Sequence, residues 1–147
     1  MQKLRIEFED SLKFSLNKLW QWGRAMTWIR KNMADDWHYY AEKAVDEFKT
    51  KLVKWKCFLF FYFSFRKNML DSSNCAPMAK MVEDTLTRYW VLQGDTNDTV
   101  VGVYYESVHK ELKERKTMEL NTVDVVIVEE GDALFNMLNT FQNGNKL

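Results

Sequence analysis

Hydrophobic positions near the N-terminus alternate with charged ones and then change to a helical spacing. Leu4, Ile6 and Phe8 alternate with charged residues, which predicts a short, half-buried strand. Asp10 or Ser11 then suits the start of a helix. The apolar positions that follow recur every three or four residues: Leu12, Leu16, Leu19, Trp22, Met26, Ile29 and Met33. We therefore expect an edge strand followed by a first amphipathic helix.

A second helix is predicted to begin at Asp35 and Asp36, where carboxylates suit the positive end of the helix dipole. Its apolar positions are Trp37, Ala41, Ala44, Phe48, Leu52, Trp55, Leu59 and Tyr62. Unbroken to Met69, this helix would be about 50 Å long, whereas a domain of this size is only about 30 Å across. We therefore expect a break near Lys56 or an oligomeric partner. Within residues 57–65 every face is apolar, so the pattern does not distinguish a buried helix from a buried strand.

The pattern changes again after residue 70. Pro77 suits the first turn of a third helix. Residues 89–93 and 99–105 are rich in β-forming side chains around a turn-forming segment, which predicts a hairpin, and residues 123–128 predict a further strand. A last helix is expected after Gly131, with these apolar residues facing inward: Leu134, Phe135, Leu138 and Phe141.

These elements predict a single α+β domain over residues 1–147, with a helical half at about 1–90 and a β-rich half at about 91–147. In this arrangement N-terminal amphipathic helices are followed by a small, mainly antiparallel sheet with short flanking helices. The opening strand is expected to join that sheet at its edge.

The charge is balanced overall but not along the chain. The 147 residues carry 21 basic and 21 acidic side chains, which argues against a strongly basic nucleic-acid binder. Residues 1–91 hold 16 basic and 11 acidic side chains, and residues 92–147 hold 5 and 10. This asymmetry could steer a partner or favour self-association, although two halves of one domain can also neutralise each other.

The chain start and the cysteines indicate a cytoplasmic protein. Charged residues occupy the first positions, where a signal peptide would need an apolar stretch. The longest uncharged apolar run has nine residues, well short of the roughly 20 that span a bilayer as a helix. Cys57 and Cys75 are too few for a disulfide framework or a zinc site, so we expect two reduced thiols and no cofactor.

The aromatic run and the lysines around it predict an interaction surface. The candidate interface consists of Trp37, Tyr40, Phe48, Trp55, Phe60, Phe61, Phe63 and Phe65. The candidate basic stripe consists of Lys49, Lys51, Lys54, Lys56, Arg66 and Lys67. A buried core or an oligomer interface accounts best for so many rings, which would promote aggregation if exposed. Interfacial membrane contact and nucleic-acid binding, with bases stacked on rings beside lysines, are the alternatives.

Three enzyme chemistries find only partial support in the sequence. Residues 125–134 superficially resemble the acidic strand of an ATPase, but the five glycines do not form a phosphate-binding loop. His38 and His109 each follow an acidic residue by three positions, as in di-iron bundles, but one lies at a predicted helix start and the other at a strand end. Cys75 lacks a basic neighbour in sequence, so a thiol nucleophile would need a distant histidine.

From these patterns we expect a non-enzymatic protein-binding or assembly protein, such as a small accessory or structural subunit that self-associates through its aromatic helical region. No catalytic, metal or small-molecule site is predicted. The alternatives are a nucleic-acid-binding protein that uses the basic stripe at 49–67, or a metal- or thiol-dependent enzyme.

Overall fold

The computed structural model describes residues 1–15, 26–89, 91–94 and 98–144, and these contain four strands and four helices. The order is β1 (Gln2–Phe8), α2 (Met26–Glu47), β2 (Cys57–Ser64), α3 (Ala76–Arg88), β3 (Val100–Ser107), α4 (Leu112–Arg115), β4 (Asn121–Glu129) and α5 (Ala133–Gly144). Two 3-10 turns, η1 (Asp10–Leu12) and η3 (Ser72–Cys75), precede α2 and α3. The α+β class is confirmed. The predicted order is wrong, because the sheet begins at residue 2 rather than after the helices.

The four strands form one mixed sheet in the order β1-β4-β2-β3. β4 is antiparallel to both β1 and β2, and β3 is parallel to β2. The expected edge position of the first strand is confirmed. Residues 57–64, which the sequence pattern does not assign to helix or strand, form β2 in the interior of the sheet. One face of this strand lies in the main core, and on the other face Phe58 is covered by Phe135 while Phe60 and Tyr62 are half-buried.

Helix α2 runs without a break through Asp35 and Asp36, so the prediction of two helices divided there is wrong. Trp37, Ala41 and Ala44 lie on one side of the helix and are buried against the sheet. The rings of Trp37 and Phe8 of β1 are 4.7 Å apart between centroids. The earlier part of the first predicted apolar stripe, at positions 16, 19 and 22, lies outside the described residues.

Helix α2 ends because the chain adopts a left-handed conformation at Lys49, where φ is 50°. The amide of Thr50 then donates a hydrogen bond to the carbonyl oxygen of Val45 at 3.0 Å, as in a Schellman cap. The helix therefore ends before the break expected near Lys56, and its predicted apolar positions from Leu52 onward are not helical. The chain instead crosses residues 49–56 in irregular structure and enters the sheet as β2.

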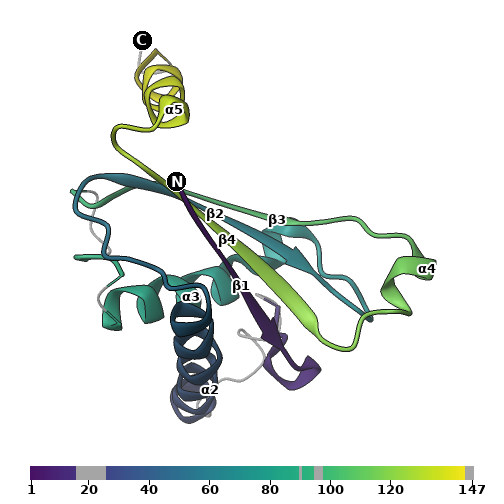
Figure 1. The fold of residues 1–147 in the computed structure, drawn as a ribbon. Coiled ribbons are helices and arrows are strands. Elements are labelled where there is room, and N and C mark those ends of the chain that lie inside the picture. Colours follow the sequence, from purple (N-terminus) through teal and green to yellow (C-terminus); the bar gives the residue numbers. More distant parts are fainter. Residues whose placement is uncertain (16–25, 90, 95–97, 145–147) are drawn as a thin grey trace.

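The main core lies between the sheet and helices α2 and α3, which Figure 1 shows on the same side of the strands. Leu59, Phe61 and Phe63 of β2 point into this core. The predicted helix after Pro77 is confirmed as α3, with Pro77 in its first turn. It buries a face that includes Met78, Val82 and Leu86.

Two predictions for the C-terminal half are wrong. β3 pairs with β2 rather than with a hairpin partner, and Val91 and Leu92 are buried without forming a strand. Residue 90 and residues 95–97 lie outside the described residues. The last helix forms as expected, but of its predicted inward residues Leu134 and Phe141 are 42% and 72% exposed.

Candidate functional site

The face of the sheet opposite α2 and α3, called the open face below, carries a row of aromatic rings. Because side chains alternate along a strand, Phe58, Phe60 and Tyr62 point away from the main core. The register between β2 and β3 places Tyr104 beside Phe60. Their ring centroids are 5.0 Å apart with 14° between the planes, and those of Phe60 and Tyr62 are 6.4 Å apart at 6°.

These rings are accessible from outside the molecule. Tyr104 is 42% exposed, and Phe60 and Tyr62 are half-buried. Val126 of β4, the register partner of Phe60, is also half-buried. A contiguous aromatic and aliphatic surface of this kind is typical of a protein–protein contact, because rings contribute large buried areas at low entropic cost.

A bidentate ion pair lies beside the rings on the two neighbouring strands. Arg5 of β1 is the register partner of Asp124 of β4. Its Nε and Nη2 atoms donate hydrogen bonds of 2.6 and 2.8 Å to the two carboxylate oxygens. Donating these hydrogen bonds to Asp124 raises the pKa of Arg5 above its ordinary value. A paired arginine can be covered by another molecule at lower cost than two separate charges, so this pair is compatible with burial.

Charged side chains of opposite sign mark the two edges of the open face. Lys3 lies on β1, two residues before Arg5 and opposite Val126 in the register. Glu106 lies on β3, opposite Tyr62. Lys3 and Glu106 therefore place opposite charges on the two edges of the open face, while Glu7 adds an acidic side chain farther along β1.

Helix α5 packs over one end of the open face, on the side of the sheet opposite α2 and α3 (Figure 1). The ring centroids of Phe135 and Phe58 are 5.1 Å apart, and the side-chain amide of Gln142 donates a 3.2 Å hydrogen bond to the carbonyl oxygen of Val101. The outer stripe of α5 consists of Leu134, Met137 and Phe141, which are 42%, 70% and 72% exposed. The helix contains no charged residue, and the side chains of this outer stripe offer apolar contacts alone.

The open face is hollowed beside β1. A hollow of about 560 Å³ is lined by residues that include Lys3, Tyr62 and Val126, and it extends round the sheet edge to Phe48. Such a hollow gives a partner side chain room to insert between the strand edge and the rings.

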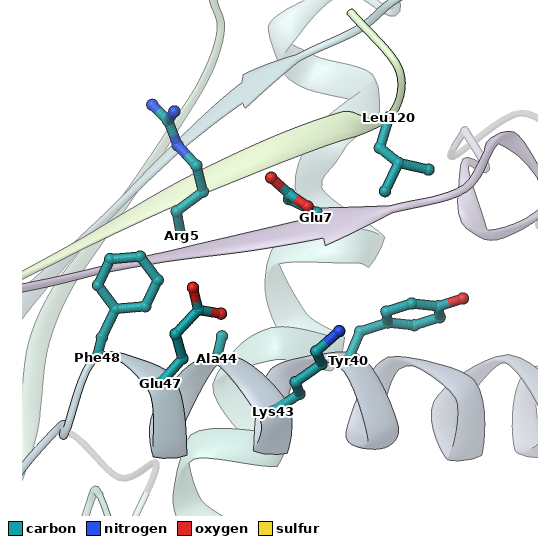
Figure 2. A pocket seen from close by; sticks show the side chains of 8 residues that line it. All are labelled: Arg5, Glu7, Tyr40, Lys43, Ala44, Glu47, Phe48 and Leu120. Carbon is teal, nitrogen blue, oxygen red and sulfur yellow. The ribbon is translucent and has the colours of Figure 1, made fainter.

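A smaller cavity of about 120 Å³ lies between β1 and α2. Figure 2 shows Lys43 and Glu47 reaching from α2 toward β1, while Arg5 extends from the strand away from the helix. Charges of both signs therefore line this cavity. It is too small for a typical organic ligand, which occupies a site of about 300 Å³ or more, so we do not assign it a binding role.

The eight residues of the predicted interface are not brought together. Trp37, Phe61, Phe63 and Phe65 are at most 1% exposed in the core of a single chain, which leaves them no surface for a partner. Tyr40 and Phe60 are half-buried, and Phe48 and Trp55 are 45% and 64% exposed. Of these eight side chains, Phe60 belongs to the row of rings on the open face.

The predicted basic stripe is divided between the two ends of β2. Four of its lysines precede the strand, and Arg66 and Lys67 follow it. A strand of eight residues is about 26 Å long, so the two groups do not share one groove. Arg66 is also engaged within the chain: its Nε atom lies 3.2 Å from a carboxylate oxygen of Asp10, and its Nη1 atom donates to the carbonyl oxygen of Glu119 at 2.7 Å.

The histidines singled out in the sequence lie apart from the open face, and the two thiols are poor nucleophiles. His38 contacts Thr85 between α2 and α3, and His109 is exposed after β3. Burial raises the pKa of both Cys57 and Cys75 to about 12, which disfavours their nucleophilic thiolate forms. Within the described ranges, no three His, Cys, Asp or Glu side chains gather as they would to hold a metal ion.

Most residues of the open face were missed by sequence reasoning. Tyr62 was assigned to a helix stripe, Tyr104 to a hairpin, and the pairing of Arg5 with Asp124 was not considered. The sequence of β1 does contain a signal for this surface. Its apolar residues alternate with charged ones, which indicates that Lys3 and Arg5 lie on the side of the strand opposite the core.

Comparison of the chain with protein families, curated proteins and solved structures finds no match. Among the described helices, none combines the length and apolar character that crossing a membrane requires. The function is therefore argued below from the geometry of the open face.

Proposed function

We propose that this chain is a non-enzymatic assembly protein that self-associates through the open face of its sheet. The observation that carries the proposal is the row of accessible rings formed by Phe60, Tyr62 and Tyr104. The contact surface therefore differs from the aromatic helical region expected from the sequence, since half of those side chains lie in the core of one chain.

A second copy of the chain suits this face because its charges are self-complementary. A two-fold axis parallel to the strands, between two stacked sheets, would place β1 of one copy over β3 of the other. Lys3 and Arg5 of one copy would then approach Glu106 of its partner, and the rings of β2 would lie near the axis. An axis across the strands would instead place β1 over β1 and β3 over β3. Where it crosses the sheet at Phe60, it brings Lys3 toward Lys3 of the other copy, which repulsion disfavours.

The available area also supports a contact that includes α5. Four strands of about eight residues cover roughly 500 Å² in projection, at about 4.8 Å between strands and 3.3 Å per residue. A stable interface buries about 800 Å² on each partner. The outer stripe of α5, with Leu134, Met137 and Phe141, is continuous with the open face through Phe135 and supplies further apolar area.

Two neighbouring tyrosines of β3 allow a matched test. Tyr104 points to the open face and Tyr105, its neighbour on the strand, to the opposite side, and the two are 42% and 39% exposed. We expect wild-type protein to sediment as a dimer at micromolar concentration. Tyr104→Lys should convert it to a monomer, because it removes a ring and places a further positive charge against Lys3 and Arg5 of the other copy, whereas Tyr105→Lys should leave it dimeric.

The second pair of variants lies on α5. Met137→Glu should weaken the dimer because Met137 belongs to the outer stripe, and Asn136→Glu, on the opposite side of the helix, should not. A wild-type protein that stays monomeric over the micromolar range would overturn the proposal. Equal effects of Tyr104→Lys and Tyr105→Lys would assign the contact to a different surface.

A further inference from the structure

A separate cavity lies between α2 and α3, on the side of the sheet opposite the open face. Its volume is about 340 Å³, which falls in the range of small-molecule sites. Arg30, Ala34 and His38 line it from α2, at intervals of four residues that place them on one side of the helix. Pro77 and Met81 line it from α3, also four residues apart. The small side chain of Ala34 in the middle of this row leaves the space between the two helices open.

The hydrogen bonds of His38 determine which of its ring nitrogens is free. The Nδ1 atom lies 2.6 Å from the hydroxyl oxygen of Thr85, and that hydroxyl donates its hydrogen to the carbonyl oxygen of Met81 at 2.8 Å. Thr85 therefore accepts a hydrogen bond from Nδ1–H of His38. In the neutral imidazole, Nε2 is then an acceptor with a free lone pair.

The surroundings of His38 favour the neutral ring. Burial lowers its pKa, and the nearby charge of Arg88 lowers it further, while Asp35 and Asp84 act in the opposite direction with smaller effect. Because Nδ1 is engaged with Thr85 and the ring lines the cavity, Nε2 is the polar atom that His38 offers to a bound molecule.

The other end of the cavity favours a negative charge. Arg30 is exposed and lies eight residues before His38, about 12 Å along the helix axis. Ala76 and Pro77 line the cavity from the first turn of α3, where the helix dipole is positive. At the rim, Lys80 and Asp84 form a 3.0 Å ion pair and so contribute little net charge.

We propose that this cavity binds a small organic acid whose apolar body carries a hydroxyl group at the end away from its carboxylate. The carboxylate contacts Arg30 and the first turn of α3, the apolar body packs against Ala34 and Met81, and the hydroxyl donates a hydrogen bond to Nε2 of His38. This site is independent of the open face, so it does not rest on the proposed self-association.

A titration of the whole chain with 3-(4-hydroxyphenyl)propionate, followed by calorimetry and by amide NMR shifts, tests the site. We expect saturable binding with the shifts concentrated around Ala34, His38 and Met81. The comparison compound 3-phenylpropionate lacks the hydroxyl and should bind about tenfold more weakly, because it leaves Nε2 without its donor.

Variants separate the roles of the two ends. Arg30→Gln and His38→Gln should each weaken binding of the hydroxylated probe by about tenfold, and His38→Gln should abolish the preference for the hydroxyl. Lys31→Gln and His109→Gln are matched controls on exposed residues outside the cavity and should bind as wild type does. Ala34→Leu should block binding by filling the space.

The same experiments can overturn the proposal. Absence of saturable binding at millimolar probe, shifts confined to the open face, or unchanged affinity in Arg30→Gln would each contradict it. Urea unfolding of every variant separates loss of binding from loss of the fold, and Arg30→Gln, at an exposed position, keeps the test valid if Ala34→Leu does not fold.

Discussion

Replacing Gly102 with alanine tests how the rings of the open face are packed. A Cβ atom at Gly102 would lie 2.7 and 2.9 Å from two ring carbons of Phe58 and 3.3 Å from a ring carbon of Tyr104. Carbon atoms in contact are about 3.5 Å apart, so the ring of Phe58 would have to retreat by somewhat less than 1 Å. Phe58 is completely buried and packs against Val128 and Phe135, so its retreat would also displace α5.

The expected magnitude follows from two opposing effects. Overpacking typically costs about 1 to 3 kcal/mol, whereas replacing glycine by alanine within a strand contributes about 0.5 to 1 kcal/mol of stability. We therefore expect Gly102→Ala to lower the free energy of unfolding by about 1 to 2 kcal/mol in urea denaturation. Gly144→Ala is a matched control, since its added methyl group meets no atom within 4 Å.

A double-mutant cycle identifies the contact responsible. Phe58→Leu removes the ring edge that the new methyl group would strike, so Gly102→Ala should cost less in that background than in wild type. A Gly102→Ala protein as stable as wild type would refute the packing described here. So would an equal cost of Gly102→Ala in the two backgrounds.

Three further predictions concern the helix end, the thiols and the pH profile. Lys49→Gly should raise the free energy of unfolding by about 0.5 to 1 kcal/mol in urea denaturation, because glycine adopts the left-handed φ of 50° without strain. A loss of stability in this variant would argue against the proposed cap. Since burial raises the pKa of Cys57 and Cys75 to about 12, both thiols should react with a thiol reagent at neutral pH only as fast as the protein opens, and rapid reaction in the native state would contradict this. Burial and Arg88 lower the pKa of His38 in the folded chain, so the unfolded chain binds a proton at His38 more readily. The contribution of His38 to the free energy of unfolding in urea should therefore be complete above about pH 6.5 and should fall as the pH decreases toward the pKa of the folded state. This decrease should be smaller in His38→Gln, and an unchanged profile would exclude His38 as its cause.

Elements whose signal is local could be predicted from the sequence. β1 alternates apolar and charged residues because one of its sides faces the core. α3 begins at a proline that suits a first helical turn, and its buried residues recur at helical spacing. In these segments the burial pattern matches the period of the element itself, so the sequence contains enough information.

The assignment of β2 depended on contacts that the sequence does not reveal. Phe61 is buried by α2 and α3, and Phe58 is buried by Phe135, which lies 77 positions later. Because apolar side chains occupy both the core side of the strand and the open face, its hydrophobic pattern loses the period of two. The end of α2 was missed for a different reason, since the left-handed residue is a lysine rather than the glycine that usually marks a cap.

The open face could be predicted only in part for the same physical reason. Phe60 was included in the expected interface, but without the period of two it could not be separated from Phe61, which lies in the core. The pairing of Arg5 with Asp124 joins positions 119 residues apart and depends on the register of β1 and β4. Strand register across such distances does not follow from local pattern.

Hydroxyl-radical footprinting of wild-type protein over a range of concentrations tests the central claim most directly. Tyr104 and Tyr105 have similar exposure in the single chain but point to opposite sides of the sheet. If a second copy covers the open face, oxidation of Tyr104 should fall as the protein concentration rises into the micromolar range, while oxidation of Tyr105 should stay constant. Equal oxidation of both tyrosines at every concentration, or protection of Tyr105 alone, would contradict self-association through the open face.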